Sequence, residues 1–151
     1  MAESQPRMSL TKGLLGLRVD RATDNILTGE DLFTIAGGRV LVTQIVGEVT
    51  TIMETKTINF KLTANPTTGT STDMCANLDL TAAEAGTLLT ISGTEADALR
   101  KGSSGSIVAQ NNPVVVAIGA IEATVGATHT GSIKWSLWYV PLDEGAYVEA
   151  A

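Results

Sequence analysis

Apolar and polar residues alternate with a period of two along several stretches of this chain. In residues 57–64 the apolar positions are Ile58, Phe60, Leu62 and Ala64. In residues 132–140 one face carries Ile133, Trp135, Leu137 and Tyr139. Because successive side chains of a strand point to opposite sides of its sheet, both stretches predict strands with one buried face.

Other candidate strands are shorter or apolar on both faces. Residues 39–50 predict a long strand whose first half is apolar on both sides, so we expect neighbouring structure to cover it there. Gly47, within this segment, is expected to lie at a bulge. Shorter candidates are residues 87–93, 106–109, 114–118 and 121–125. About seven to nine antiparallel strands separated by turns predict a barrel or a sandwich.

Two segments carry the signals of short helical turns. Thr81 and Glu84 have capping-box spacing, and Gly86 is placed to end the turn. Residues 94–102 begin with a threonine, carry acids early and bases late, and end on a glycine. The predicted fold class is therefore all-β: an antiparallel barrel or sandwich with an extended N-terminal arm and one or two short helical turns.

Residues 1–32 differ from the rest because they lack alternation of strand length. Glycines interrupt any helix in this part, and isolated leucines mix with scattered charge. We therefore predict an extended N-terminal arm over residues 1–32 and a single β domain over residues 33–151. The leucines are too many for a freely solvated tail, so we expect the arm to pack on its own domain or on a neighbour.

Trp138 stands out in the strand predicted over residues 132–140, because it falls on the polar face. Two interpretations stay open. Either an arm or loop of the same chain covers this side chain, or Trp138 is an anchor in a subunit interface, where tryptophan is enriched. The candidate interface residues are Leu10, Leu14, Leu15, Leu17 and Trp138.

Residues that could carry chemistry are few. His129 is the single histidine, and its polar turn predicts a solvated side chain. Cys75 is the single cysteine, so no intrachain disulfide can form, and its neighbours predict a small buried hydrophobic side chain. The sequence has no phosphate-binding loop, no EF-hand spacing and no zinc-ligand pattern. We therefore predict no catalytic residue, no cofactor and no metal, and a protein that is not an enzyme.

The composition limits the classes of partner that we expect. The net charge of −6 repels phosphate backbones, so we expect no nucleic-acid partner. No stretch approaches the roughly 20 apolar residues of a membrane span, and the N-terminus lacks the apolar run of a signal peptide. We expect a soluble protein that is made in the cytoplasm and has no membrane partner. Aromatic residues make up 4 %, too few for a sugar-stacking cleft, so a carbohydrate-binding or hydrolytic domain is the least favoured class.

Three short segments carry a resemblance to a known group of proteins. Residues 131–146 read GSIKWSLWYVPLDEGA, and residues 47–51 and 62–70 read GEVTT and LTANPTTGT. These segments resemble parts of the small structural proteins that are encoded in the head-gene region of tailed bacteriophages. The resemblance implies a capsid decoration, or cement, protein that binds the major capsid protein on the outer surface of the head, often as a homotrimer. It also implies location in the virion after synthesis in the host cytoplasm, and it carries over no active site.

A different virion component is the main alternative. A tail-tube, tail-fibre or head-fibre module would share the β-rich composition and the absence of catalytic motifs. Such a module would assemble into rings or stacks by itself, whereas a decoration protein would be a discrete trimer or monomer in solution. Self-assembly in solution therefore separates the two classes.

Overall fold

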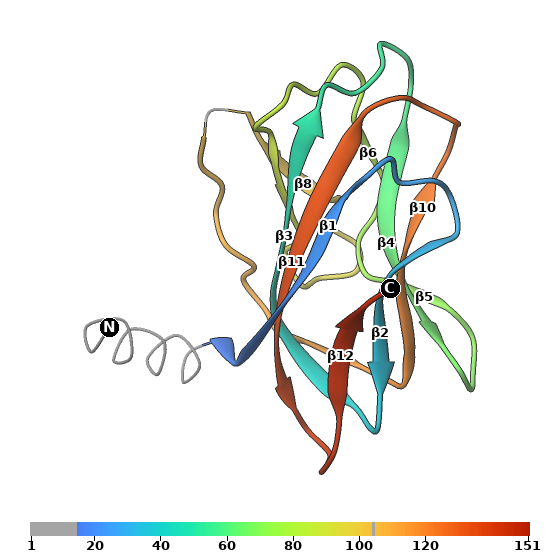
Figure 1. Cartoon of the computed structure of the whole chain (residues 1–151), viewed down its shortest axis with the longest axis vertical. Coiled ribbons are helices and arrows are strands. Elements are labelled where there is room, and N and C mark those ends of the chain that lie inside the picture. Colours follow the sequence, from blue (N-terminus) through green and yellow to red (C-terminus); the bar gives the residue numbers. More distant parts are fainter. Residues whose placement is uncertain (1–14, 104) are drawn as a thin grey trace.

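The structure, a computed structural model, describes residues 15–103 and 105–151. In these residues two antiparallel sheets pack against each other as a sandwich (Figure 1). Sheet A has the order β1-β11-β3-β7-β8, with β9 also paired to β3, and sheet B has the order β12-β2-β10-β4-β5, with β6 also paired to β4. The predicted all-β, antiparallel fold is confirmed in its sandwich form, because neither sheet closes on itself.

The strands of each sheet come from distant parts of the chain. Sheet A consists of β1 (Leu17–Asp24), β3 (Val40–Thr51), β7 (Leu88–Thr90), β8 (Arg100–Gly102), β9 (Val114–Val116) and β11 (Ser132–Pro141). Sheet B consists of β2 (Glu30–Ala36), β4 (Asn59–Pro66), β5 (Thr72–Asp73), β6 (Leu78–Asp79), β10 (Gly119–Val125) and β12 (Tyr147–Ala150).

The core lies between the sheets and is built by the faces that alternation predicted. The alternating apolar residues of β11 are all buried, as are Phe60 and Leu62 of β4. Burying one such side chain contributes roughly 1.5–3 kcal/mol. The rings of Trp135 in sheet A and Phe60 in sheet B stack with centroids 6.0 Å apart, so this pair connects the two sheets within the core.

Gly47 provides the space for the Trp135 ring. The two residues are partners in the β3–β11 ladder, and a Cβ atom on Gly47 would lie 2.8–2.9 Å from three carbons of the indole. The prediction of a bulge at Gly47 is wrong. The register of this ladder shifts elsewhere, where Thr43 and Thr50 of β3 have no partner on β11.

One edge of β3 changes partner along its length, and Gln110 bridges the gap. The strand pairs with β9 near its beginning and with β7 further on. Between these two ladders, Ile45 N donates to Gln110 Oε1 (3.1 Å), and Gln110 Nε2 donates to Val42 O (3.1 Å) and Asn112 O (2.8 Å). The backbone N–H of Gln110 donates to Gln44 Oε1 at 2.9 Å. A buried side-chain amide thus takes the place of a missing strand.

The N-terminal part of the chain departs from the prediction. Residues 1–32 were expected to lack strands, but β1 and the beginning of β2 lie within this range. Strand β1 pairs with β11 along sheet A, so residues 17–24 are part of the sandwich and are not an extended arm. Residues 1–14 lie outside the described residues, and the arm predicted there stays a prediction.

The two predicted helical turns are instead tight turns. Thr87 N donates to Glu84 O and Asp97 N donates to Thr94 O, both at 3.1 Å, as single turns without a following helix. The strand predicted over residues 106–109 is also absent. This segment is irregular, and Arg100 Nη2 of β8 holds its end by donating to Ala109 O at 3.0 Å.

Arg39 and Asp143 join the β2–β3 turn to the β11–β12 turn. The guanidinium donates to both carboxylate oxygens at 2.8 and 2.9 Å, and Arg39 N donates to Asp143 Oδ2 at 2.8 Å. These hydrogen bonds hold the pKa of Asp143 well below the ordinary value of 3.8. The largest effect comes from the side chain of Arg39, and the next from its backbone N–H. The pair therefore favours the ionised carboxylate in the folded state.

Asp143→Asn should lower stability at neutral pH, and the loss should shrink in acid. A carboxylate whose folded pKa is lowered contributes stability above its unfolded pKa and loses it as the pH falls through the folded value. The free energies of unfolding of wild type and variant, measured in urea, should differ at pH 7, and the difference should shrink progressively as the pH falls below about 4. Glu144→Gln removes the adjacent exposed carboxylate and is the control. A difference that is the same at every pH would contradict the assignment.

Candidate functional site

The structure brings three of the five predicted interface residues to one end of sheet A. Leu17 begins β1 and pairs with Tyr139, the residue after Trp138, so its side chain lies on the face of Tyr139 and not on that of Trp138. The hydroxyl of Thr43 donates to Leu15 O at 2.5 Å and approaches Trp138 O at 3.3 Å, which places Leu15 at the same end. Leu10 and Leu14 lie outside the described residues.

Trp138 is half-buried on the outer face of sheet A, and β1 supplies its cover. Arg18 is its partner in the β1–β11 ladder, and the guanidinium carbon lies 5.1 Å from the indole centroid. Arg18 Nε also donates to Asp20 Oδ1 at 2.8 Å, and Ser136 Oγ donates to the same oxygen at 2.7 Å. The Ser136 hydrogen bond, and then Arg18, lower the pKa of Asp20 against the opposing effect of its burial. Strand β1 thus orients a cation over the ring.

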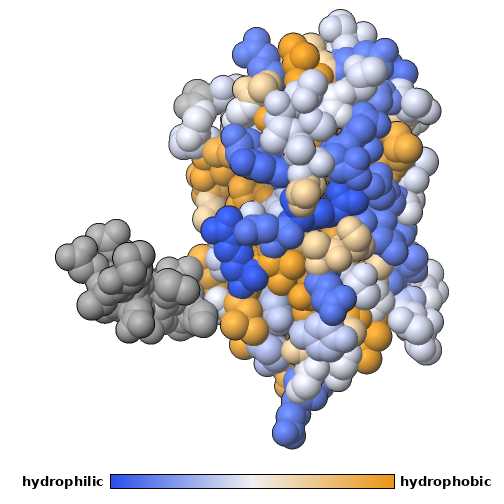
Figure 2. Space-filling view, viewed as in Figure 1, coloured by the Kyte–Doolittle hydropathy of each residue, from blue (hydrophilic) through white to orange (hydrophobic). Residues whose placement is uncertain are grey.

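Next to Trp138, an apolar row crosses three strands on the outer face of sheet A. The ladders pair Val115 of β9 with Leu41 of β3, and Leu41 with Val140 of β11. Val115 is 59 % exposed and Val140 is 37 % exposed. We call Leu41, Val115, Trp138 and Val140 the arm-exit face, because residues 1–14 precede Leu15 beside it. Figure 2 shows hydrophobic surface on the left of the molecule, near the beginning of β1.

Charged side chains lie on this outer face beyond the apolar row and give it a polar border. Lys134 and Glu48 pair across β11 and β3 at 3.2 Å, and Arg18 and Asp20 lie on β1. An exposed apolar patch with a polar rim is typical of a surface that binds another protein. Sequence reasoning found Trp138 but missed the valines, because only the strand register shows that Val115 and Val140 flank Leu41.

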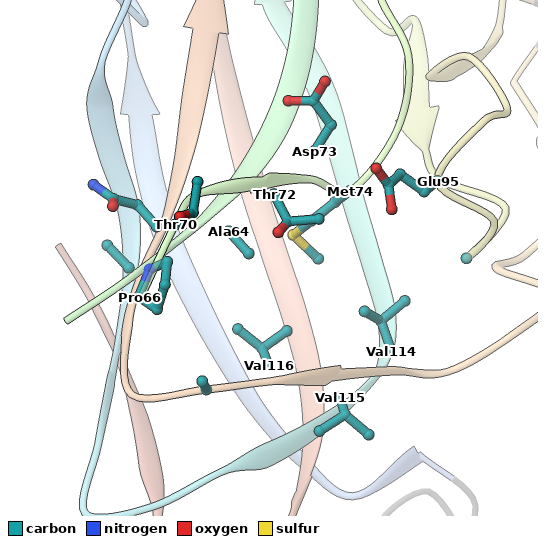
Figure 3. Close-up of a pocket in the computed structure, with 14 residues that line it drawn as sticks. Ala64, Pro66, Thr70, Thr72, Asp73, Met74, Glu95, Val114, Val115 and Val116 are labelled. Atoms are coloured by element: carbon teal, nitrogen blue, oxygen red, sulfur yellow. The ribbon is translucent and has the colours of Figure 1, made fainter. Parts of the chain in front are cut away.

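A cleft lies where the edges of the two sheets approach each other. This cleft has a volume of about 360 Å³, and its walls come from β9, from β4 and β5, and from the turn at Gly93–Glu95. Figure 3 shows Val114 and Val116 pointing into the cleft and Val115 pointing away from it. The opposite wall carries Thr72 and Met74. The floor is apolar, and the rim is polar.

Two carboxylates lie at the rim of the cleft in different settings. Asp73 Oδ2 accepts from Lys61 Nζ at 2.8 Å, so a neighbouring cation already neutralises it. Glu95 is exposed and has no hydrogen bond or ion pair within the described part of the chain. The cleft therefore presents one uncompensated negative charge beside an apolar floor.

The histidine and the cysteine are both buried, and they serve packing. The prediction of a solvated His129 is wrong: the ring is 4 % exposed, and Nε2 lies 2.7 Å from Ile26 O, which fixes the loop against the segment between β1 and β2. Asn25 Nδ2 reinforces this contact by donating to His129 O at 3.0 Å. The predicted burial of Cys75 is confirmed, and desolvation raises the pKa of its thiol to about 11, which disfavours the reactive thiolate.

The described residues contain no group of three or more histidine, cysteine, aspartate or glutamate side chains that could hold a metal ion. Among the same residues, no helix has the length and apolar character needed to cross a membrane. Comparison of the chain with protein-family models, with curated proteins and with solved structures finds no match. The arm-exit face and the cleft are therefore the candidate binding surfaces of the described residues.

Proposed function

We propose that this chain is a structural virion protein that decorates the outer surface of a phage head and stabilises it. It binds the major capsid protein through the arm-exit face, and the predicted arm adds contacts beyond the domain. The resemblance of residues 131–146 to phage head proteins supports this function. The observation that carries the binding surface is the exposed apolar row that crosses β9, β3 and β11.

A decoration protein needs a stiff body, and the sandwich supplies one. The apolar row lies on β9, β3 and β11, whose inner faces contribute to the core, so the contact surface keeps its shape when it binds. Preorganised surfaces bind with a smaller entropy cost than mobile ones. Assembly as a homotrimer would present three such faces at once, and effective concentration would then strengthen weak individual contacts.

The test is sedimentation with empty, expanded capsids of the phage that encodes the chain. Val115→Asp and Val140→Asp place charges in the apolar row and should each weaken capsid binding by about tenfold or more. Ile52→Asp is the matched control, because Ile52 is 55 % exposed and follows the other end of β3. Thermal unfolding of each variant verifies that it folds. Unchanged binding by both valine variants would exclude the arm-exit face.

The alternative of a tail or head-fibre module is favoured by one feature of the sandwich. Strands β1 and β12 are edge strands of the two sheets, and they contact each other along one side of the molecule. Exposed strand edges can pair with edges of another copy and so build rings or tubes. Light scattering on the purified chain separates the classes: a hexamer or tube favours the tail module, whereas a trimer or monomer favours decoration.

A further inference from the structure

The cleft between β9 and β5 has the features of a site for an extended peptide. Strand β9 pairs with β3 on one side only, so alternate backbone N–H and C=O groups of Val114–Val116 point away from the sheet. No other backbone hydrogen bond of β9 occurs within residues 15–103 and 105–151. An unpaired strand edge beside a cleft can accept an additional strand.

The side chains of the cleft form a linear pattern along β9. Val116 and Val114 point into the cleft at the two ends of the strand, and Glu95 lies on the rim near Val114 (Figure 3). A strand added antiparallel to β9 would therefore meet an apolar position, a second apolar position and then a negative charge. These three positions match every second residue of the added strand, because side chains on one face recur with a period of two.

The N-terminal segment of this chain has the complementary pattern. Residues 7–12 read RMSLTK, so in an extended conformation Met8, Leu10 and Lys12 fall on one side. The alternation covers few residues, but β9 itself has only three. Residues 1–14 contain two side-chain cations and one anion, whereas the whole chain has a net charge of −6. The segment is therefore attracted to the acidic domain.

We propose that residues 7–12 of one copy bind in the cleft of a second copy, antiparallel to β9. Met8 lies against Val116, Leu10 lies against Val114, and Lys12 pairs with Glu95. This contact goes beyond capsid decoration: it joins copies of the chain to one another, in a manner that does not need the capsid.

The position of Leu15 favours a second copy over the same copy. Leu15 is held on the outer face of sheet A by Thr43, whereas the cleft opens between the sheets beyond β9. To occupy its own cleft, the chain would have to turn around the edge of β9 within the two residues between Lys12 and Leu15. About 3.3 Å per residue gives residues 7–14 an extended reach of roughly 26 Å, enough to enter a neighbouring molecule.

The experiment is sedimentation equilibrium of the full chain, without capsids, for two charge reversals and their mixture. Wild type should self-associate with rising concentration, and salt should weaken the association. Lys12→Glu reverses the charge in the segment, and Glu95→Lys reverses the charge at the cleft. Each substitution should weaken association by about tenfold or more. Mixing the two variants should restore association, because the Lys12 segment of one finds the Glu95 cleft of the other.

Glu84→Lys is the matched control, since it makes the same charge change at an exposed residue in the turn before β7. It should associate as wild type does. A wild type that stays monomeric at all concentrations would overturn the proposal, and so would occupation of the cleft by the segment of the same copy. Equal loss with Glu84→Lys, or a mixture that fails to associate, would also overturn it. Capsid binding is measured separately, so either proposal can fail alone.

Discussion

Replacing Gly47 by alanine is expected to lower the free energy of unfolding by about 2–3 kcal/mol. The new methyl carbon would lie 2.8–2.9 Å from the Trp135 ring, and stacking on Phe60 from the other sheet hinders the ring from moving away. At an uncrowded strand position, the same substitution would stabilise by roughly 0.5–1 kcal/mol, because glycine loses more conformational freedom on folding. The sign of the effect therefore reports the contact between Gly47 and Trp135.

A double-mutant cycle isolates this contact. In a Trp135→Leu background the crowding is gone, so Gly47→Ala should cost nothing further, which gives a coupling energy of about 2–3 kcal/mol. Urea unfolding followed by far-ultraviolet circular dichroism is suitable, because the signal does not depend on tryptophan. Gly126→Ala is the control, since its nearest non-local contact would be 3.4 Å away. Additive effects of the two substitutions would show that Gly47 is not required by the indole.

Strands with one buried face could be predicted from the sequence, whereas edge strands could not. Alternation located β4 and β11 because every second residue of each strand is apolar and faces the core. Strand β1 reads LRVDRATD, and Arg21 is its only buried residue, so no hydrophobic period marks it. Its identity comes from backbone pairing with β11, more than a hundred residues away. Pairing of this kind is set by tertiary structure and leaves little local signal.

The candidate site shows the same limit. Trp138 could be found because a large aromatic residue on a polar face breaks the pattern of its strand. The cover provided by Arg18 and the valine row beside it depend on register between strands distant in sequence. His129 was mispredicted for a related reason: its partner is the carbonyl of Ile26, 103 residues earlier. Local polarity indicated solvent, whereas the fold supplies a buried acceptor.

Gln110→Glu is expected to cost about 3–5 kcal/mol at neutral pH, because it opposes two carbonyl oxygens with a carboxylate. In the wild type, Gln110 Nε2 donates to Val42 O and Asn112 O, while Oε1 accepts from Ile45 N. A buried carboxylate can keep the bond from Ile45 and loses both donors. Protonation restores one donor, so the variant should regain stability relative to wild type as the pH falls. A carboxylate that the fold stabilises in its ionised form, such as Asp143, shows the opposite trend, because its contribution to stability is lost in acid.

Asn111→Asp is the control, since it makes the same chemical change at the exposed neighbouring residue. It should leave the free energy of unfolding within about 0.5 kcal/mol of wild type. Equal effects of the two variants would mean that the amide of Gln110 does not bridge β3. If Gln110→Glu alone is destabilising, native-state hydrogen exchange should show that the amides of β9 and of β3 near Ile45 open first. Strand β9 carries both Val115 and the edge of the cleft, so the bridge that completes sheet A also positions the two surfaces proposed for binding.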